Sequence, residues 1–181
     1  MAYNPGNEGG QAIADILFGD VNPSGKLPLS YPRYANMLFT YDHKTLEGEQ
    51  AENAPLYAPQ FEFGYGLSYT TYAYSDLQVI PPSGSSDQNI QVAVTVKNNG
   101  DRAGKEVVQL YLNEQAASIT PPLKRLKRFA KIQLQAGETR RYIFELTKED
   151  LSFINAENKR VVEPGLFDIH IGGLKQTFAW K

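Results

Sequence analysis

Ile90-Gln-Val-Ala-Val-Thr-Val-Lys97, followed by Asn98-Asn-Gly100, is the stretch of this sequence that decides the fold. Isoleucine and valine occupy every second position, and mainly polar residues stand between them. Successive side chains on a β-strand point to opposite faces, so this alternation predicts a strand with one buried face. Asn-Asn-Gly is a turn signal, because these residues readily adopt the backbone angles of tight turns. The predicted strand should therefore end close to Asn98.

Similar short segments recur on the C-terminal side of this strand. Further strands are predicted over residues 106–112, 129–134, 139–146, 166–171 and 176–180. Turn signals separate several of them, and on the strand at 166–171 we expect Phe167, Ile169 and Ile171 to face inward. About six to eight short strands with frequent turns are typical of an antiparallel β-sandwich. We expect this sandwich to occupy residues 70–181.

Residues 1–35 have a different pattern, which predicts a turn, a helix and a second turn. Asn7 is the expected N-cap of the helix, and Gly19 follows its end. Apolar residues at helical spacing form one face, made of Ala12, Ile13, Ile16 and Leu17. One short helix cannot bury such a face by itself. This part of the chain is therefore expected to pack against a sheet that the sequence mostly does not contain.

Residues 36–69 show no sustained helix or strand period. They are acidic and interrupted by prolines, and the aromatic residues expected to pin them to a surface are Tyr57, Phe61, Phe63, Tyr65 and Tyr69. A connection of this length without regular structure is unusual inside a compact domain. Two interpretations stay open at this point: the segment lies across a neighbouring surface, or it is a long ordered loop of this chain's own fold.

Composition and charge exclude several classes of function. The chain has 181 residues, of which 41% are hydrophobic and 21% charged, as in an ordinary globular protein. The net charge of −2 creates no field that would favour nucleic acid or an anionic membrane. Without cysteine there is no thiolate metal site, and His43 and His170 alone cannot form a three-histidine zinc site. No cofactor or metal is therefore expected, and no apolar run is long enough to span a membrane.

Acidic residues are plentiful in the first part of the chain, and paired carboxyl groups can act as general acid and base. None stands in a sequence setting that marks it as catalytic, and we expect solvated side chains at Asp15, Asp42, Glu47, Glu49, Glu52 and Glu62. Glu8 is the exception, because it lies in a glycine-rich helix start. Its charge would suit the helix dipole there. The functional alternative is a place in a substrate cleft.

Other candidate motifs are incomplete. His170 and Asp168 share a strand face and could pair, most simply on the outside of the sandwich. Gly66-Leu-Ser68-Tyr-Thr70 lacks the last glycine of a nucleophile elbow. Gly64-x-Gly66 lacks the third glycine of a dinucleotide fingerprint and precedes no helix. The basic run Lys124-Arg-Leu-Lys-Arg128 favours an edge strand kept soluble by charge over an anion-binding or nucleic-acid patch.

Longer motifs carry a family resemblance. In the first part of the chain they are Pro5-Gly-Asn-Glu-Gly-Gly10, Ala14-Asp-Ile-Leu-Phe-Gly-Asp20, Asn22-Pro-Ser-Gly-Lys-Leu-Pro28 and Phe63-Gly-Tyr-Gly-Leu-Ser-Tyr-Thr70. In the sandwich they are Val96-Lys-Asn-Asn-Gly100, Ala103-Gly-Lys-Glu-Val-Val-Gln-Leu-Tyr111, Pro122-Leu-Lys-Arg-Leu-Lys-Arg-Phe129 and Glu163-Pro-Gly165. In this order they resemble the C-terminal part of glycoside hydrolase family 3, the β-glucosidase type. The resemblance covers essentially the whole chain, and its last motifs are similar to the fibronectin type III-like domain that ends such enzymes.

The resemblance implies a parent enzyme of three parts: an N-terminal (β/α)₈-type barrel, an α/β sandwich domain and the fibronectin type III-like sandwich. Residues 1–35 would be a terminal strand–helix remnant of the α/β domain, and residues 36–69 an irregular connector. Residues 70–181 would be the fibronectin type III-like β-sandwich, so the expected fold class is mainly β. The barrel and the rest of the α/β domain would then be the partners of this chain.

The resemblance also implies retaining hydrolysis of β-linked glycosides, with an aspartate nucleophile from the barrel and an acid/base glutamate upstream of the Pro5–Gly10 motif. No position here matches either residue, so no catalytic residue is assigned and Glu8 stays only a substrate-cleft candidate. We therefore expect a C-terminal fragment with a structural support role, inactive alone, whose β-glycoside substrate binds only to the full-length enzyme. The alternative is a stand-alone sandwich module that binds carbohydrate or protein. A periplasmic or extracellular parent enzyme fits the resemblance.

Overall fold

The structure is a computed structural model of the chain, and it describes residues 2–36, 40–44, 59–80 and 89–181. Two helices and nine strands are formed by these residues, most of them in the C-terminal part. In chain order they are α1 (Gly9–Phe18), β1 (Tyr72–Ile80), β2 (Ile90–Asn98), β3 (Gly104–Glu114), β4 (Arg125–Leu134), β5 (Thr139–Leu146), α2 (Lys148–Leu151), β6 (Phe153–Ile154), β7 (Arg160–Val161), β8 (Gly165–Ile171) and β9 (Leu174–Trp180).

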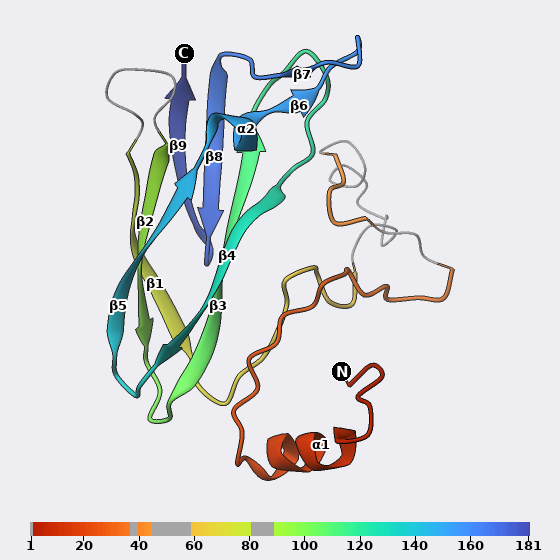
Figure 1. Cartoon of the computed structure of the whole chain (residues 1–181), viewed down its shortest axis with the longest axis vertical. Helices are drawn as coiled ribbons and strands as arrows, with labels where there is room; N and C mark the ends of the chain where they lie inside the picture. Colours follow the sequence, from red (N-terminus) through yellow and green to blue (C-terminus); the bar gives the residue numbers. More distant parts are fainter. Residues whose placement is uncertain (1, 37–39, 45–58, 81–88) are drawn as a thin grey trace.

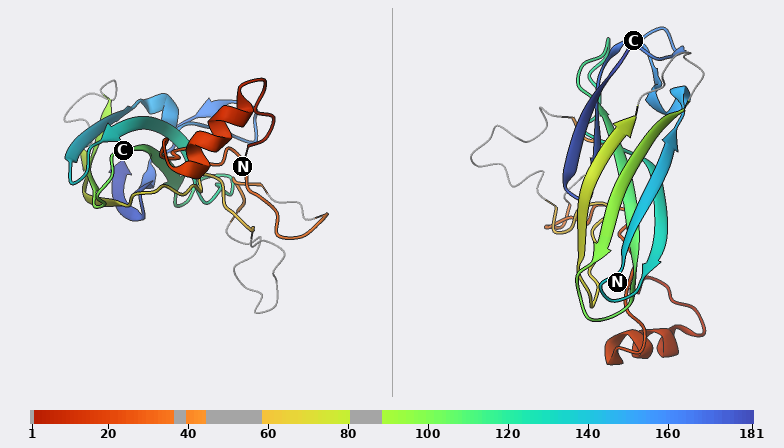
Figure 2. Two further views of the ribbon diagram at one scale, coloured as in Figure 1. Left: turned by 90° about the horizontal axis from the view of Figure 1, so that it is seen from below. Right: turned by 90° about the vertical axis from the view of Figure 1, so that its left-hand side faces the viewer.

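The main body is an antiparallel β-sandwich of two layers (Figure 1). One layer has three strands in the order β1-β2-β5, and the other has four in the order β4-β3-β8-β9. The layers face each other along their whole length, with α1 beyond one end and the C-terminus at the other (Figure 2). The short hairpin β6-β7 lies beside the C-terminal end. The predicted fold class, mainly β and antiparallel, is confirmed.

The strands predicted from alternation are all present, and each extends over at least the predicted residues. Strand β1 was not predicted, and its backbone explains why. Asp76 has a positive φ of 51°, and the pairing of β1 with β2 shifts between Ser75 and Gln78. Such a bulge adds a residue to one strand and interrupts the alternation of its side chains. Helix α2 and the two-residue strands β6 and β7 were also not predicted, because they are too short to show a period.

The hydrophobic core lies between the two sheets. Its fully buried side chains include four of β2 and three of β8, namely Ile90, Val92, Val94, Val96, Phe167, Ile169 and Ile171. Phe167 stacks on Phe178 of β9, with 5.6 Å between the ring centroids. Burying one such side chain contributes roughly 1.5–3 kcal/mol relative to leaving it in water. The inward positions predicted for the strand at 166–171 are confirmed, and the sandwich has a core of its own.

Helix α1 lies outside this core (Figures 1 and 2). Gly19 ends it in the left-handed conformation, with φ 89°, and donates its N–H to the Ile16 carbonyl, as predicted for a glycine at this position. The prediction of Asn7 as N-cap was wrong by one residue. The first helical hydrogen bond runs from Ala12 N–H to the Glu8 carbonyl, so Glu8 is the N-cap, and its side chain forms no capping hydrogen bond.

The described residues between α1 and β1 form an irregular path along the sandwich (Figure 1). Their only bridge, among the described residues, pairs Tyr31 with Phe61. Tyr41 stacks on Phe63 with 4.4 Å between centroids, and Phe63 meets the Tyr111 ring of β3 edge-on at 6.4 Å. This part of the connector therefore packs on the chain's own sandwich, which favours the interpretation as an ordered loop. Tyr57 lies outside the described residues.

Candidate functional site

Three segments that are distant in the sequence meet at the end of the sandwich nearest α1. They are residues 22–28, residues 66–70 and residues 98–106. We name this meeting place the junction. Its polar side chains are Asn22, Lys26, Ser68, Thr70, Asn98, Arg102 and Glu106. Each segment belongs to a motif that carried the family resemblance in the sequence, so these motifs form one structural unit.

The side chain of Asn22 holds the three segments together. Its Oδ1 accepts hydrogen bonds from Ser68 Oγ and the Tyr69 backbone N–H, both at 2.8 Å. Its Nδ2 donates to the Ala103 carbonyl at 3.1 Å. Ser68 is thus engaged with an amide rather than with a histidine, which agrees with the absence of a nucleophile elbow in the sequence.

A second amide, Asn98, lies fully buried at the end of β2. Its Oδ1 accepts hydrogen bonds from Thr70 Oγ1 at 2.5 Å and from the Gly100 N–H at 3.1 Å. Its Nδ2 donates to the Arg102 carbonyl at 2.8 Å and to the Leu134 carbonyl at 3.3 Å. A buried amide with all these partners fixes the turn after β2 against both sheets. The sequence analysis read this residue only as a turn signal.

Lys26 reaches from the N-terminal segment to the inward face of β3. Its Nζ lies 3.3 Å from Glu106 Oε1, and the Tyr74 hydroxyl donates to the same oxygen at 2.8 Å. Burial, followed by the charge of Glu106, raises the pKa of Tyr74 far above its ordinary value, so the phenol stays a donor. Glu106 was not predicted as a site residue. The signal was available, because a carboxylate at an inward position of an apolar strand requires a buried partner.

Glycines at the junction allow backbones to approach closely. A Cβ on Gly66 would lie 2.2 Å from the Gly25 carbonyl oxygen, and one on Gly104 would lie 2.2 Å from the Tyr72 hydroxyl. Gly64-x-Gly66 therefore serves the packing of the connector, which agrees with the rejection of a dinucleotide fingerprint. The glycine residues of these motifs have a structural reason that involves no ligand.

The junction also holds the C-terminal end of α1. The Tyr69 hydroxyl donates to the Ile16 carbonyl at 2.6 Å, and Arg102 donates to the Gly19 carbonyl at 3.2 Å. The guanidinium of Arg102 lies 5.8 Å from the centroid of the Tyr69 ring. Cationic and O–H donors are favourable at this end, because helical carbonyls there lack partners within the helix. Polar contacts thus attach α1, while its apolar side chains remain uncovered.

The predicted acidic candidates do not come together. Glu8 is exposed at the start of α1, and Asp42 is exposed in the connector. Glu62 lies 3.9 Å from Lys124 Nζ in an exposed pair. Glu47, Glu49 and Glu52 lie outside the described residues. Within the described part of the chain, these carboxylates form no paired acid and base.

Asp168 takes partners other than His170. Its carboxylate is almost fully buried and accepts hydrogen bonds from Gln115 Nε2 at 3.0 Å and Thr177 Oγ1 at 2.6 Å, with Lys175 Nζ at 2.8 Å. Burial alone would raise the pKa of Asp168, but these three donors hold it below its ordinary value. Burial lowers the pKa of His170. Of these two described residues, Asp168 thus accepts its hydrogen bonds from Gln115, Thr177 and Lys175 and none from His170, which its charge affects only electrostatically.

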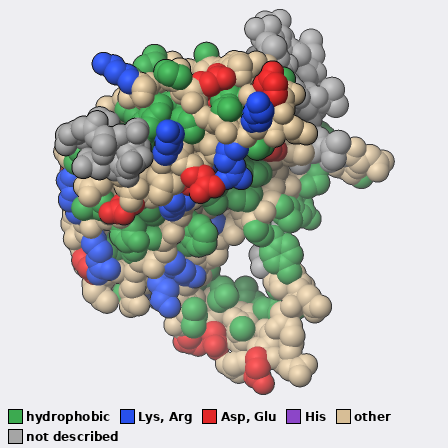
Figure 3. Space-filling view, turned by 45° about the horizontal axis from the view of Figure 1, so that its top comes forward, with side chains coloured by type: hydrophobic (Ala, Val, Ile, Leu, Met, Phe, Trp, Pro, Cys, Tyr) green, Lys and Arg blue, Asp and Glu red, His purple; other side chains and the backbone are tan. Residues whose placement is uncertain are grey.

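Residues 125–128 of the basic run lie on β4, which is an edge strand of the four-stranded sheet, as predicted. Arg128 forms a bidentate pair with Asp150, at 2.7 and 2.6 Å. Burial, followed by the charge of Arg125, lowers the pKa of Lys127. Acidic and basic side chains are interspersed over the visible face of the sandwich (Figure 3). The arrangement does not create the single-sign surface that nucleic acid requires.

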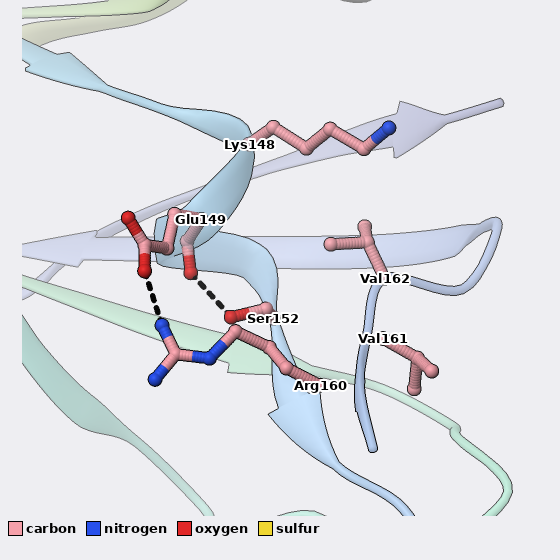
Figure 4. A pocket seen from close by; sticks show the side chains of 6 residues that line it. All are labelled: Lys148, Glu149, Ser152, Arg160, Val161 and Val162. Atoms are coloured by element: carbon pink, nitrogen blue, oxygen red, sulfur yellow. Dashed lines mark hydrogen bonds and ion pairs between the residues drawn. The ribbon is translucent and has the colours of Figure 1, made fainter.

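A shallow hollow of about 580 Å³ lies beside α2 and β7. Glu149 pairs with Arg160, and Ser152 Oγ donates to the Glu149 carbonyl (Figure 4). The lining residues are Lys148, Glu149, Ser152, Arg160, Val161 and Val162. Because the carboxylate and the guanidinium satisfy each other at this exposed site, the hollow offers no activated acid, base or nucleophile.

Three further observations limit what the described residues can do. No three of their His, Cys, Asp or Glu side chains gather into a metal site. None of their helices is long and apolar enough to cross a membrane. Trp180, the single tryptophan, is only 9% exposed and belongs to the core. Trp180 therefore cannot serve as a surface platform for stacking on a sugar ring.

Comparison with known proteins gives the junction its context. The family model "Glycosyl hydrolase family 3 C-terminal domain" matches residues 1–69, and "Fibronectin type III-like domain" matches residues 106–175. A periplasmic β-glucosidase of Salmonella typhimurium is 41% identical over 92% of this chain and 23% of its own length. A lysosomal β-glucosidase of Dictyostelium discoideum is 42% identical over 95% of this chain and 22% of its own length.

Solved structures agree with these sequence matches. A β-glucosidase from Erythrobacter marinus has a TM-score of 0.89 and 39% identity, covering 98% of this chain and 24% of its own. A Listeria innocua β-glucosidase solved with isofagomine has a TM-score of 0.83 and 38% identity, covering 97% of this chain and 26% of its own. The chain thus spans about a quarter of the length of these relatives. Together the matches show that the chain belongs to glycoside hydrolase family 3, with its residues 1–69 matching the family's C-terminal domain and its residues 106–175 a fibronectin type III-like domain.

Proposed function

We propose that this chain is the non-catalytic C-terminal part of a retaining β-glucosidase-type hydrolase. In this proposal residues 1–35 complete an α/β domain that preceding residues supply, and residues 36–69 connect it to the sandwich of residues 70–181. The sandwich then buttresses the α/β domain through the junction. The close contacts of Asn22, Asn98 and the Lys26–Glu106 pair support a fixed orientation between the two.

The observation that carries the proposal is the uncovered apolar face of α1. Ile13 and Ile16 are 38% and 37% exposed, and Leu17 and Phe18 are 73% and 85% exposed. A helix of this length gains most of its stability from packing an apolar face rather than from its own hydrogen bonds. A face of this kind is expected to have a sheet against it. Relatives about four times as long as this chain would supply that sheet from preceding residues.

The catalytic groups would also come from preceding residues. A retaining glycosidase needs a nucleophile and an acid/base carboxyl group about 5 Å apart. The exposed carboxylates of Glu8, Asp42 and Glu62 lie in surroundings that activate none of them. We propose an aspartate nucleophile from a barrel and a glutamate acid/base from the α/β domain, with the β-glycoside bound only by the full-length enzyme. A periplasmic or extracellular location is part of the same proposal.

Hydrolysis of p-nitrophenyl β-glucoside tests this proposal. The purified 181-residue chain should release no nitrophenol, whereas a version extended upstream through the barrel should turn over. Activity of the short chain that survives repurification would overturn the proposal. Failure of both forms to act on glucosides, xylosides and related β-glycosides would overturn the assignment of the substrate class.

Glu8 remains a proposed cleft residue of the full-length enzyme. It precedes α1 in a glycine-containing turn, where Gly6 has φ 71°, and its side chain is exposed and free of a capping hydrogen bond. In the extended enzyme, Glu8→Gln should raise KM several-fold, and the exposed control Asp20→Asn should leave KM unchanged. Equal KM values for the two variants would remove Glu8 from the substrate site.

A further inference from the structure

Glu114 is a buried carboxylate that the junction and the proposed function do not use. It is the last residue of β3 and only 4% exposed, at an inward position of the strand. Its Oε1 is buried and has no hydrogen-bond partner among the residues that the structure describes. Leaving a buried charged oxygen unpaired costs more free energy than leaving a buried neutral polar group unpaired. An oxygen in this position therefore calls for a cationic or protic partner.

Other oxygen atoms surround the same place, which lies next to the first residue of β8. A Cβ built on Gly165 would lie 3.9 Å from Glu114 Oε1 and 3.7 Å from the Ala116 carbonyl oxygen. The Glu163 carboxylate belongs to the same cluster of loops, since its Oε2 accepts the Ser118 N–H at 2.8 Å. The last residue of β3, the loop that follows it and the loop that precedes β8 thus contribute two carboxylates and a main-chain carbonyl.

The charges at this place are unbalanced. Burial raises the pKa of Glu114, the negative charge of Glu163 raises it further, and the guanidinium of Arg125 partly opposes both. Two carboxylates against one guanidinium leave a net charge of −1 when both acids are ionised. A bound cation would relieve the repulsion between the acids and satisfy the unpaired oxygen at the same time.

We propose that Glu114, Glu163 and the Ala116 carbonyl form an oxygen-only site for a hard divalent cation, with Ca²⁺ as the ion that fits it best. Ca²⁺ takes carboxylate and carbonyl oxygens in flexible geometry and completes its shell with water, whereas Mg²⁺ demands near-octahedral geometry. With few protein ligands and a nearby guanidinium, the affinity should fall in the weak range of extracellular modules, on the order of 10⁻⁴–10⁻³ M. The ion would fasten the loop after β3 to the start of β8, independently of the proposed function.

Sequence inspection could not find such a site. The absence of cysteine and the scarcity of histidine excluded only sites built from those ligands. Glu114 and Glu163 are 49 positions apart, and the third oxygen belongs to the main chain, which every residue carries. The pairing of Glu114 with Phe167 across β3 and β8 brings them together.

Thermal unfolding of the 181-residue chain in EDTA and in millimolar CaCl₂ tests the proposal. At a tenfold excess of Ca²⁺ over Kd the Tm should rise by about 3–6 °C, and MgCl₂ should give a smaller rise. Glu114→Gln and Glu163→Gln should remove the response, and Glu157→Gln, an exposed control close in sequence, should retain it. Calcium titration by calorimetry should show one site that both variants lose.

Glu114→Gln should itself fold, because a neutral amide costs less to bury than an unpaired carboxylate. A proton is the competing partner for Glu114. If the proton alone satisfies this group, the wild-type Tm will be the same in EDTA and CaCl₂, and it will fall as the pH rises from the ordinary glutamate pKa through the raised pKa of Glu114. That result would overturn the proposal. A calcium response that Glu114→Gln retains would place the ion elsewhere and overturn it as well.

Discussion

The sandwich buries its apolar side chains within this chain, whereas the N-terminal segment finds partners within it mainly for its polar groups. In the sandwich the apolar side chains of both sheets face each other and are mostly fully buried. In residues 2–36 the backbone and polar side chains find partners within the chain, at α1, Asn22 and Lys26, while Leu17, Phe18 and their neighbours stay exposed. The hydrogen bonds of α1 are formed within this chain, and in the proposed full-length enzyme preceding residues would cover its apolar side chains. In that proposal the sandwich is a self-sufficient domain and α1 is a piece of another one.

Truncating a large apolar side chain should give the largest difference in the free energy of unfolding between the sandwich and α1. Phe167→Ala, fully buried on β8, should lower the free energy of unfolding by about 3–5 kcal/mol because it removes apolar contacts and leaves a cavity. Phe18→Ala on α1 should change it by less than about 0.5 kcal/mol, because that ring is exposed. Urea unfolding followed by the fluorescence of Trp180, which lies in the core, measures both. Similar losses for the two variants would mean that α1 is packed in solution.

The buried amide of the junction should have the next largest effect. Asn98→Ala leaves the Arg102 and Leu134 carbonyls and the Thr70 hydroxyl without their partner, which should cost about 2–4 kcal/mol. Asn99→Ala removes an exposed side chain of the same turn and is the matched control. The same urea titration measures both. A loss for Asn98→Ala no larger than that of the control would contradict the role of this amide.

Asp168 should make the stability of the sandwich depend on pH. Its pKa is held below the ordinary value in the folded state, so its contribution is present at neutral pH and is lost as the pH falls through the ordinary and then the lowered pKa. Asp168→Asn should therefore cost about 1–3 kcal/mol at pH 7 and almost nothing in strong acid. Urea unfolding at a series of pH values checks this. A cost that is equal at every pH would show that the charge of Asp168 does not matter.

Two glycines of α1 should give small effects of opposite sign. Gly19→Ala places a Cβ in the left-handed conformation and should weaken the end of the helix by about 1 kcal/mol. Gly10→Ala, at an open helical position, should favour the helix by about 0.5–1 kcal/mol. Amide hydrogen exchange of residues 9–18 detects both, with the sandwich as an internal reference. Changes of the same sign would contradict the assigned helix boundaries.

The sequence predicted the strands whose apolar and polar side chains alternate regularly. Alternation in β2 and β8 marked their inward faces, because the period of a strand is visible in a single chain. Strand β1 escaped because the bulge at Asp76 breaks its period. The uncovered face of α1 was also predictable, since Ile13, Ile16 and Leu17 follow helical spacing and no sheet accompanies them.

The segments that form the junction were recognised in the sequence as motifs, but the contacts between their side chains were not predicted. Its contacts join residues that are far apart, such as Asn22 with Ala103 and Lys26 with Glu106, and no local pattern encodes such distances. His170 and Asp168 failed as a hydrogen-bonded pair for a related reason, because the stronger donor Lys175 comes from the neighbouring strand β9. In the structure the side chain of Glu8 is exposed and forms no capping hydrogen bond. Its role in a substrate cleft stays a prediction.

Amide hydrogen exchange of α1 tests most directly whether its apolar face is built for a missing partner. In the 181-residue chain, residues 9–18 should exchange fast while β2, β3 and β8 are strongly protected, because helices without tertiary packing open at little cost. In a version extended upstream, the same residues should become protected to a degree close to that of the sandwich. Equal, high protection of α1 and the sandwich in the short chain would contradict this view, as would an α1 that stays unprotected in the extended form.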